Sequence, residues 1–247
     1  MLRAVVLTVL LIPGAAAAET ALVAVAANYA GAAEAQARAF FAASGHEITL
    51  STGSTGKLYA QILAGAPFDV LLAADAASPQ MLEAAGAGAA GTRFTYALGA
   101  LVLWSPDPAR IGADPVAALR DAGLRHLAIA NPDLAPYGAA ARQALEALDI
   151  WQAVQDRIVQ GENVGQTHAL VATGAAEAGF VALSAVPPEA GGSRWQVPQA
   201  LFAPIRQDAL LLAHGAGNPA ARGFLDWLQG PQAQQINAAF GYGAAAP

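Results

Sequence analysis

The sequence contains no cysteine and little charge. The absence of cysteine among the 247 residues excludes a disulfide framework, a thiolate nucleophile, a cysteine-ligated metal and a lipid anchor on a cysteine after a signal peptide. Only 12% of residues are charged, and 12 Lys and Arg stand against 18 Asp and Glu. A nucleic-acid surface needs clustered Lys and Arg, so this balance argues against a nucleic-acid partner. General attraction cannot hold an anion either, so a bound anion would need local dipoles.

Long apolar runs are also missing, apart from a short one at the N-terminus. Arg3 is followed by an apolar run from Ala4 to Ile12 and by a row of alanines that ends at Ala18. This order is typical of a secretory signal peptide, and a run this short cannot cross a bilayer, which takes about 20 residues. The sequence therefore predicts a signal peptide over residues 1–18, cleavage near Ala18, and a protein free in a bacterial periplasm. Loss of Arg3 changes the formal net charge from −6 to about −7.

Short apolar or β-branched segments alternate with longer segments rich in Ala, Leu and Gln. Such alternation is typical of strands followed by crossover helices on a largely parallel sheet. The predicted strands are Leu22 to Ala26, Glu47 to Ser51, Phe68 to Ala73, Tyr96 to Trp104, Leu127 to Ala130 and Gly179 to Leu183. The predicted helices are Ala30 to Ala43, Lys57 to Ala64, Ser78 to Ala85, Gly138 to Ile150, Gln166 to Thr173, Pro219 to Leu228 and Pro231 to Phe240. The fold class is therefore predicted to be α/β.

The chain is long enough for two compact lobes. The apolar segment from Tyr96 to Trp104 lies where the chain can cross to a second lobe, and we interpret Ala209 to Ala213 as the return crossing. We therefore predict a first lobe formed by residues 19–98 plus 215–247 and a second lobe formed by residues 99–214. A hinge would join the lobes, a ligand cleft would lie between them, and the two terminal helices would pack on the first lobe.

Four polar or glycine-flanked turns come directly before predicted helices, two in each predicted lobe. They are Asn28-Tyr29, Ser54-Thr55-Gly56, Pro136-Tyr137-Gly138 and Asn163-Val164-Gly165. The N–H groups in the first turn of a helix have no internal acceptor, and a helix N-terminus carries partial positive charge. A small anion held between the lobes can thus be surrounded by neutral donors, and the lobes would close around it.

Several segments also carry a family resemblance that spans nearly all of the chain after residue 18. The chain resembles the molybdate-binding periplasmic proteins of bacterial ABC transporters. The segments are VAVAANYA (23–30), TGSTGKLYAQILAGAPFDVLLAAD (52–75), ANPDLAPYGAAARQALE (130–146), GENVGQT (161–167), GFVALSAV (179–186) and FLDWLQGPQAQQI (224–236). The resemblance implies a type II periplasmic-binding-protein fold and capture of molybdate or tungstate without catalysis or a cofactor. It also implies delivery to the membrane subunits of an ABC transporter, and we expect a monomer.

The resemblance also assigns ligand contacts, and they coincide with the four turns. They are Asn28, Ser54, Thr55 and the main-chain N–H groups of Tyr137 and Val164, and no side chain would ligate a metal directly. Many members have a serine where this chain has Asn28, and some have a tyrosine where it has Ala182. The amide of Asn28 would replace the serine donor, although by itself an asparagine here is also typical of a plain helix N-cap.

Other functions have weaker signals in the sequence. GSTGK (53–57) suggests a phosphate-binding loop, but the full pattern needs Gly at 51 and Ser or Thr at 58, where Ser51 and Leu58 stand. The four histidines show no metal-ligand spacing, and neither a nucleophile elbow nor a credible acid pair is visible. Two alternatives remain: binding of another oxyanion such as sulfate or an organic acid, and a secreted enzyme that acts on an anionic substrate in the cleft.

Overall fold

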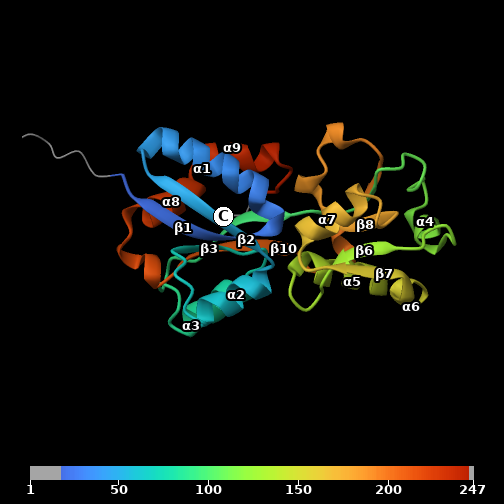
Figure 1. Ribbon diagram of the computed structural model, residues 1–247, viewed down its shortest axis with the longest axis horizontal. Coiled ribbons are helices and arrows are strands. Elements are labelled where there is room, and N and C mark those ends of the chain that lie inside the picture. Colours follow the sequence, from blue (N-terminus) through green and yellow to red (C-terminus); the bar gives the residue numbers. More distant parts are fainter. Residues whose placement is uncertain (1–17, 245–247) are drawn as a thin grey trace, which may run out of the picture.

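The computed structural model describes residues 18–244, so the predicted signal peptide over residues 1–18 lies outside the described residues except for Ala18. Two lobes lie side by side along the long axis, and each is a sheet flanked by helices (Figure 1). The predicted α/β class is confirmed. Within residues 18–244, none of the helices has the length and apolar character that a bilayer crossing requires.

The first lobe is built on a five-stranded mixed sheet. In spatial order its strands are β2 (Glu47–Gly53), β1 (Thr20–Ala26), β3 (Val70–Leu72), β10 (Ile205–Leu211) and β4 (Phe94–Gly99). Its helices are α1 (Ala30–Ser44), α2 (Thr55–Leu63), α3 (Ala77–Ala84), α8 (Pro219–Gln229) and α9 (Pro231–Ala239). Side chains alternate along β1, so Val23 and Val25 pack with α1 and α8 while Ala24 packs with α2 and α3. The terminal helices therefore pack on the first lobe, as predicted.

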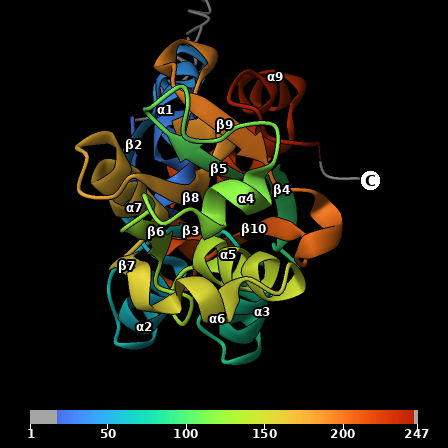
Figure 2. The same cartoon turned by 90° about the vertical axis from the view of Figure 1, so that its right-hand side faces the viewer.

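The second lobe repeats this arrangement with its own core. Its strands, in spatial order, are β7 (Ile158–Gly161), β6 (Leu127–Ala130), β8 (Ala178–Ala182), β5 (Leu101–Ser105) and β9 (Ser193–Gln196). Its helices are α4 (Pro115–Arg120), α5 (Pro136–Ala147), α6 (Trp151–Val154) and α7 (Val164–Ala172). Figure 2 views the molecule from the end of this lobe and shows α5 and α6 together on one side of its sheet. A single cluster of buried side chains forms its core.

The chain crosses between the lobes through two adjacent strand ends. The apolar segment predicted as one strand is two, because β4 ends at Gly99 in the first sheet and β5 begins at Leu101 in the second. The return crossing predicted at residues 209–213 is wrong, since β10 pairs antiparallel with β3 and β4 of the first sheet. Because β10 belongs to the first sheet, the second lobe ends before Ile205 rather than at residue 214. Ile205 lies opposite Gly99 in the β10–β4 ladder, which brings both crossings together.

Helix starts gather at the junction of the lobes. The helix α2 begins at Thr55 and α7 at Val164, each two residues earlier than predicted, because Ser54 and Asn163 act as N-caps. The helix α5 begins at Pro136, which suits the first helical position because a proline has no N–H to leave unpaired. Three helix N-termini thus point free N–H groups toward the same junction.

Candidate functional site

A small cavity between the lobes brings together all five residues that the sequence singles out. It is lined by Ala26, Ala27, Asn28, Gly53, Ser54, Thr55, Ala74, Ala135, Pro136, Tyr137, Asn163 and Val164. The first lobe supplies Asn28, Ser54 and Thr55, and the second supplies Tyr137 and Val164. No side chain in this lining is charged. The cavity therefore offers dipoles and hydrogen-bond donors in place of formal charge.

The start of α2 presents two hydroxyl groups to the cavity. Ser54 Oγ accepts the N–H of Lys57 across 3.4 Å and caps the helix. Thr55 is only 1% exposed, and its Oγ1 accepts the N–H of Ala74 across 3.0 Å. Since Ala74 donates to Thr55, the hydroxyl proton of Thr55 remains free to donate into the cavity. The Thr55 N–H is also in the first turn and lacks a helical acceptor.

The starts of α5 and α7 present main-chain donors from the second lobe. Pro136 has no N–H, so Tyr137 carries the first main-chain donor of α5. Val164 is the first residue of α7, and the Asn163 side chain caps that helix through the N–H of Gln166 instead. Among the hydrogen bonds of residues 18–244, none uses the N–H of Tyr137 or Val164. Both groups are therefore available to an anion in the cavity.

Asn28 is not a helix N-cap, which corrects that interpretation of the sequence. It lies in a 3-10 turn (Ala27–Tyr29) before α1, and no side-chain cap is made there. Its Nδ2 donates to Gln207 Oε1 across 2.8 Å and to the Tyr242 hydroxyl across 3.2 Å. Its main-chain oxygen accepts from Tyr242 across 2.6 Å and from Ser184 Oγ across 2.9 Å. Asn28 thus connects the cavity to a buried polar network.

Four buried tyrosines surround this network and keep it neutral. They are Tyr29, Tyr96, Tyr137 and Tyr242. Burial is the main cause that raises the pKa of each of them above the ordinary value. All four hydroxyls therefore stay protonated over the physiological pH range. The floor of the cavity adds no negative charge that would repel an anion.

Polar contacts cross from one lobe to the other around the cavity. The N–H of Gly56 donates to the carbonyl of Leu134 across 2.9 Å. Lys57 Nζ lies 2.8 Å from Glu162 Oε2, and Ser184 donates to the Asn28 carbonyl. A Cβ at Gly56 would lie 3.0 Å from the Leu134 oxygen, so the close approach of these two segments requires glycine. The structure is thus closed around the cavity.

Carboxylates stay outside the cavity. Asp75 lines a larger open groove beside it, together with Tyr59, Gln143 and Arg206. Burial raises the pKa of Asp75, and its carboxylate accepts the N–H and the hydroxyl of Ser78 in the first turn of α3. These two bonds hold the Asp75 carboxylate outside the cavity.

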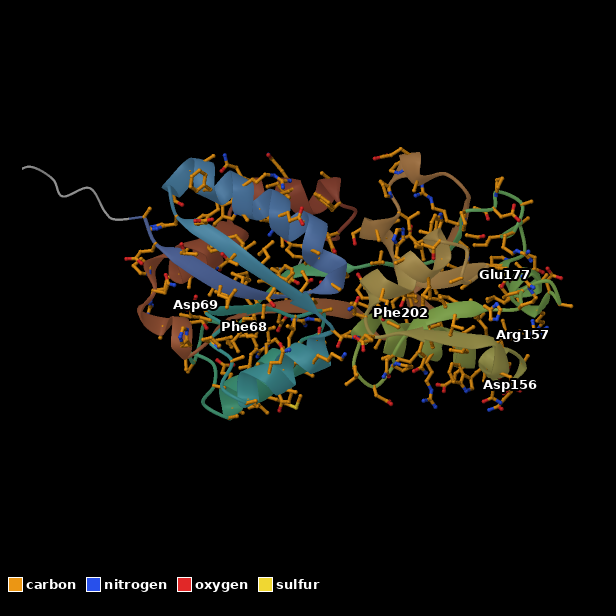
Figure 3. The ribbon with its side chains drawn as sticks, viewed as in Figure 1. Phe68, Asp69, Asp156, Arg157, Glu177 and Phe202 are labelled. Carbon is orange, nitrogen blue, oxygen red and sulfur yellow. The ribbon has the colours of Figure 1, made fainter. Side chains whose placement is uncertain are left out.

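Several charged side chains lie at the outer end of the second lobe, away from the junction. Figure 3 shows Asp156, Arg157 and Glu177 at the outer end of the second lobe, while Phe202 lies nearer the first lobe. Within the described residues, no three His, Asp or Glu side chains converge on a point where a metal ion could sit.

Sequence reasoning missed the supporting residues of the site. Gln207, Tyr242 and Ser184 all contact Asn28 but lie 156 or more positions away in the chain. Local patterns cannot reveal such contacts. Only the placement of β10 in the first sheet brings Gln207 beneath the cavity.

Known proteins are similar to this chain over most of its length. A family model described as bacterial extracellular solute-binding protein matches residues 21–243. The molybdate-binding protein ModA of Azotobacter vinelandii is 48% identical, over 93% of this chain and 92% of its own. The molybdate-binding protein ModA of Rhodobacter capsulatus is 44% identical, over 92% of this chain and 89% of its own.

Solved structures show the same similarity. The periplasmic molybdate-binding protein of Azotobacter vinelandii has a TM-score of 0.87 at 40% identity and covers 92% of this chain and 100% of that chain. The sulfate-binding protein SubI of Mycobacterium tuberculosis has a TM-score of 0.75 at 14% identity, over 93% of this chain and 88% of that chain. The second match is a likeness of fold alone.

Proposed function

Because this chain belongs to the family of bacterial extracellular solute-binding proteins, we propose that it captures molybdate in the cavity between its lobes and delivers it to the membrane subunits of an ABC transporter. The type II periplasmic-binding-protein fold predicted from the sequence is confirmed by the similar solved structures. The chain is a binding protein and not an enzyme, as its curated relatives are named. The observation that carries the proposal is the uncharged, donor-lined cavity formed by both lobes.

The proposed ligand contacts are the five residues of the cavity that the sequence singled out. Thr55 and Ser54 would donate through their hydroxyls, and Tyr137 and Val164 through their main-chain N–H groups, with Asn28 as a further side-chain donor. A hydrogen bond to a charged group contributes roughly 1.5–3 kcal/mol. Several such bonds are needed to offset the loss of water from a dianion, and here they come from both lobes.

The same donors favour a fully ionised tetrahedral oxyanion. A main-chain N–H cannot accept the proton of a protonated oxyanion such as hydrogen phosphate, which would leave two donors facing each other. Tungstate has the same charge and shape as molybdate, so we propose that it binds as well. We also propose that the protein acts as a monomer in the periplasm after removal of residues 1–18.

Calorimetry with the purified protein tests this function. Molybdate and tungstate should bind with one ligand per chain and raise the melting temperature, because a ligand that binds only the folded state stabilises it by mass action. Phosphate at the same concentration should bind much more weakly, because it is partly protonated near neutral pH. Binding of sulfate with no response to molybdate would exclude the molybdate assignment, and light scattering on the loaded protein tests the monomer.

A further inference from the structure

One buried amide beneath the cavity lacks a hydrogen-bond partner. Gln207 is fully buried on β10, and among the described residues its Nε2 has no acceptor. Its Oε1 lies 2.8 Å from Asn28 Nδ2 and 3.1 Å from the Tyr96 hydroxyl. Tyr96 has one proton, and its hydroxyl also lies 3.0 Å from the Ala73 carbonyl. Leaving a buried N–H unpaired is costly, so this arrangement of Gln207 needs an explanation.

Asn28, which lies beside Gln207, has no N–H group left over. In this arrangement both N–H bonds of Asn28 point at protein atoms, one at Gln207 and one at Tyr242. An amide nitrogen has only two hydrogens, so none remains for an anion in the cavity that Asn28 lines. The Asn28 side chain then contributes no donor to the site.

Rotating the terminal amide groups of Asn28 and Gln207 by 180° gives Gln207 Nε2 an acceptor and frees the N–H groups of Asn28. The oxygen and nitrogen of an amide are nearly equal in size, so every heavy atom keeps its place. Gln207 Nε2 then donates to Asn28 Oδ1 across the same 2.8 Å and to the Tyr96 oxygen across 3.1 Å, while Tyr96 donates to Ala73. In this orientation the one proton of Tyr242 serves either the main-chain oxygen of Asn28, 2.6 Å away, or its Oδ1, 3.2 Å away, and Ser184 also donates to the main-chain oxygen. The N–H groups of Asn28 become free.

Lobe closure favours the turned orientation. The hydroxyl of Tyr137, from the second lobe, lies against Gly99 beside the unpaired end of Gln207, where a Cβ would leave no room for either group. With Oε1 of Gln207 at that end, the tyrosine can donate to it. Tyr137 belongs to α5 of the second lobe, and the closed arrangement of the lobes places its hydroxyl here.

We propose that Gln207 is a positioning residue of the oxyanion site: it donates to Asn28 Oδ1 and so holds Asn28 Nδ2 as a donor to the ligand. This inference rests on the proposed function, since it assigns a role in binding the same anion. It makes specificity depend on a residue that lines no part of the cavity. A carboxylate in place of the Gln207 amide could not donate and would lose this effect.

The test compares two fully buried glutamines of the first lobe. Gln207→Met removes the proposed positioning amide, and Gln36→Met is the matched control, because Gln36 bonds to Tyr29, Asn237 and Trp227 away from the cavity. Both changes should lower the melting temperature. Only Gln207→Met should weaken molybdate binding in calorimetry, by about tenfold or more, as expected for the loss of one charge-assisted donor.

A second comparison separates positioning from general damage. In an Asn28→Ala background, Gln207→Met should change the molybdate Kd by less than about twofold, because a residue that acts through Asn28 has nothing left to position. The nitrogen-15 resonance of the Asn28 side chain should also shift on loading of the wild type. Equal molybdate affinity in wild type and Gln207→Met, or an additive effect in the double variant, would overturn this inference and leave the proposed function standing. Failure of the wild type to bind molybdate would overturn the proposed function and this inference with it.

Discussion

Lys57 Nζ lies 2.8 Å from Glu162 Oε2, so an ion pair joins the two lobes next to the cavity. Both side chains are largely exposed, and exposed ion pairs contribute only about 0–1 kcal/mol. Their charges nevertheless act on a bound anion in opposite directions. Lys57 attracts it and Glu162 repels it.

Neutralising the two members of this pair should therefore have opposite effects on affinity. We expect Lys57→Gln to weaken molybdate binding and Glu162→Gln to strengthen it, each by about 1 kcal/mol or less. Both effects should shrink at high ionic strength, because salt screens exposed charges. Calorimetry at two salt concentrations measures this. Arg142 and Glu146 form an exposed pair within α5, and the same substitutions there should leave affinity unchanged.

The close approach at Gly56 gives a test of lobe closure. In Gly56→Ala the new Cβ would lie 3.0 Å from the Leu134 oxygen and 3.1 Å from its Cα, so the lobes must separate slightly. We expect weaker molybdate binding and a larger radius of gyration of the loaded protein in small-angle scattering. Gly112→Ala is the control, because a Cβ there meets no atom within 4 Å. An unchanged affinity for Gly56→Ala would contradict the role of this contact.

The hydroxyl of Thr55 should be a direct donor. Thr55→Ala removes it and should weaken molybdate binding by roughly 1–3 kcal/mol, because a ligand oxygen loses its partner. Thr55→Ser keeps the hydroxyl and should retain most of the affinity. Thr92→Ala serves as a control, since the Thr92 hydroxyl donates to Ala89 in a part of the first lobe away from the cavity. Wild-type affinity in Thr55→Ala would show that the site is misplaced.

The main-chain donor at the start of α7 can be removed without breaking the helix. Val164→Pro deletes the N–H at the first helical position, where proline is favoured. Asn163 already has the extended backbone that precedes a proline, with φ −149° and ψ 171°. We expect unchanged helix content by circular dichroism and molybdate binding weakened by roughly 1.5–3 kcal/mol. Val164→Ala keeps the N–H, and its affinity should stay close to that of the wild type.

Stability should depend on pH through His168. Burial lowers the pKa of His168, whose ring stacks on Trp104 with 5.0 Å between ring centroids. As pH falls below the ordinary histidine pKa of about 6.5, the unfolded chain binds the proton before the folded protein does, so the free energy of unfolding decreases. In His168→Phe this part of the acid dependence should disappear. Urea unfolding of both proteins between pH 5 and 8 measures the free energy of unfolding at each pH. The same change of this free energy with pH in both proteins would contradict the prediction.

The helix entrances could be predicted from the sequence because their signals are local. Ser54 and Asn163 are N-caps and Pro136 is a first-position proline, and each of these acts within three residues of its helix start. The same local logic failed at Asn28. A short polar residue before a helix looks like a cap, but its side chain turns instead toward β10 and the C-terminal segment.

The lobe boundary could not be predicted because the apolar sequence of β10 is compatible with two kinds of segment. A continuous apolar run is typical both of a segment that crosses between lobes and of a central strand buried on both faces. Only pairing with β3 and β4 decides between them, and that pairing joins residues more than 100 positions apart. The strands β7 and β9 were also missed, and each contains polar residues among its four.

The placement of β10 and Tyr242 has a consequence for biosynthesis. The first sheet lacks a central strand until β10 is made, and the bond from Tyr242 to Asn28 requires nearly the last residue of the described chain. A nascent chain emerging from the ribosome therefore cannot complete the lobe that its own N-terminal residues begin. The first lobe can fold fully only after β10 and Tyr242 have been made, whereas the second lobe is one continuous stretch of chain with its own core and needs neither.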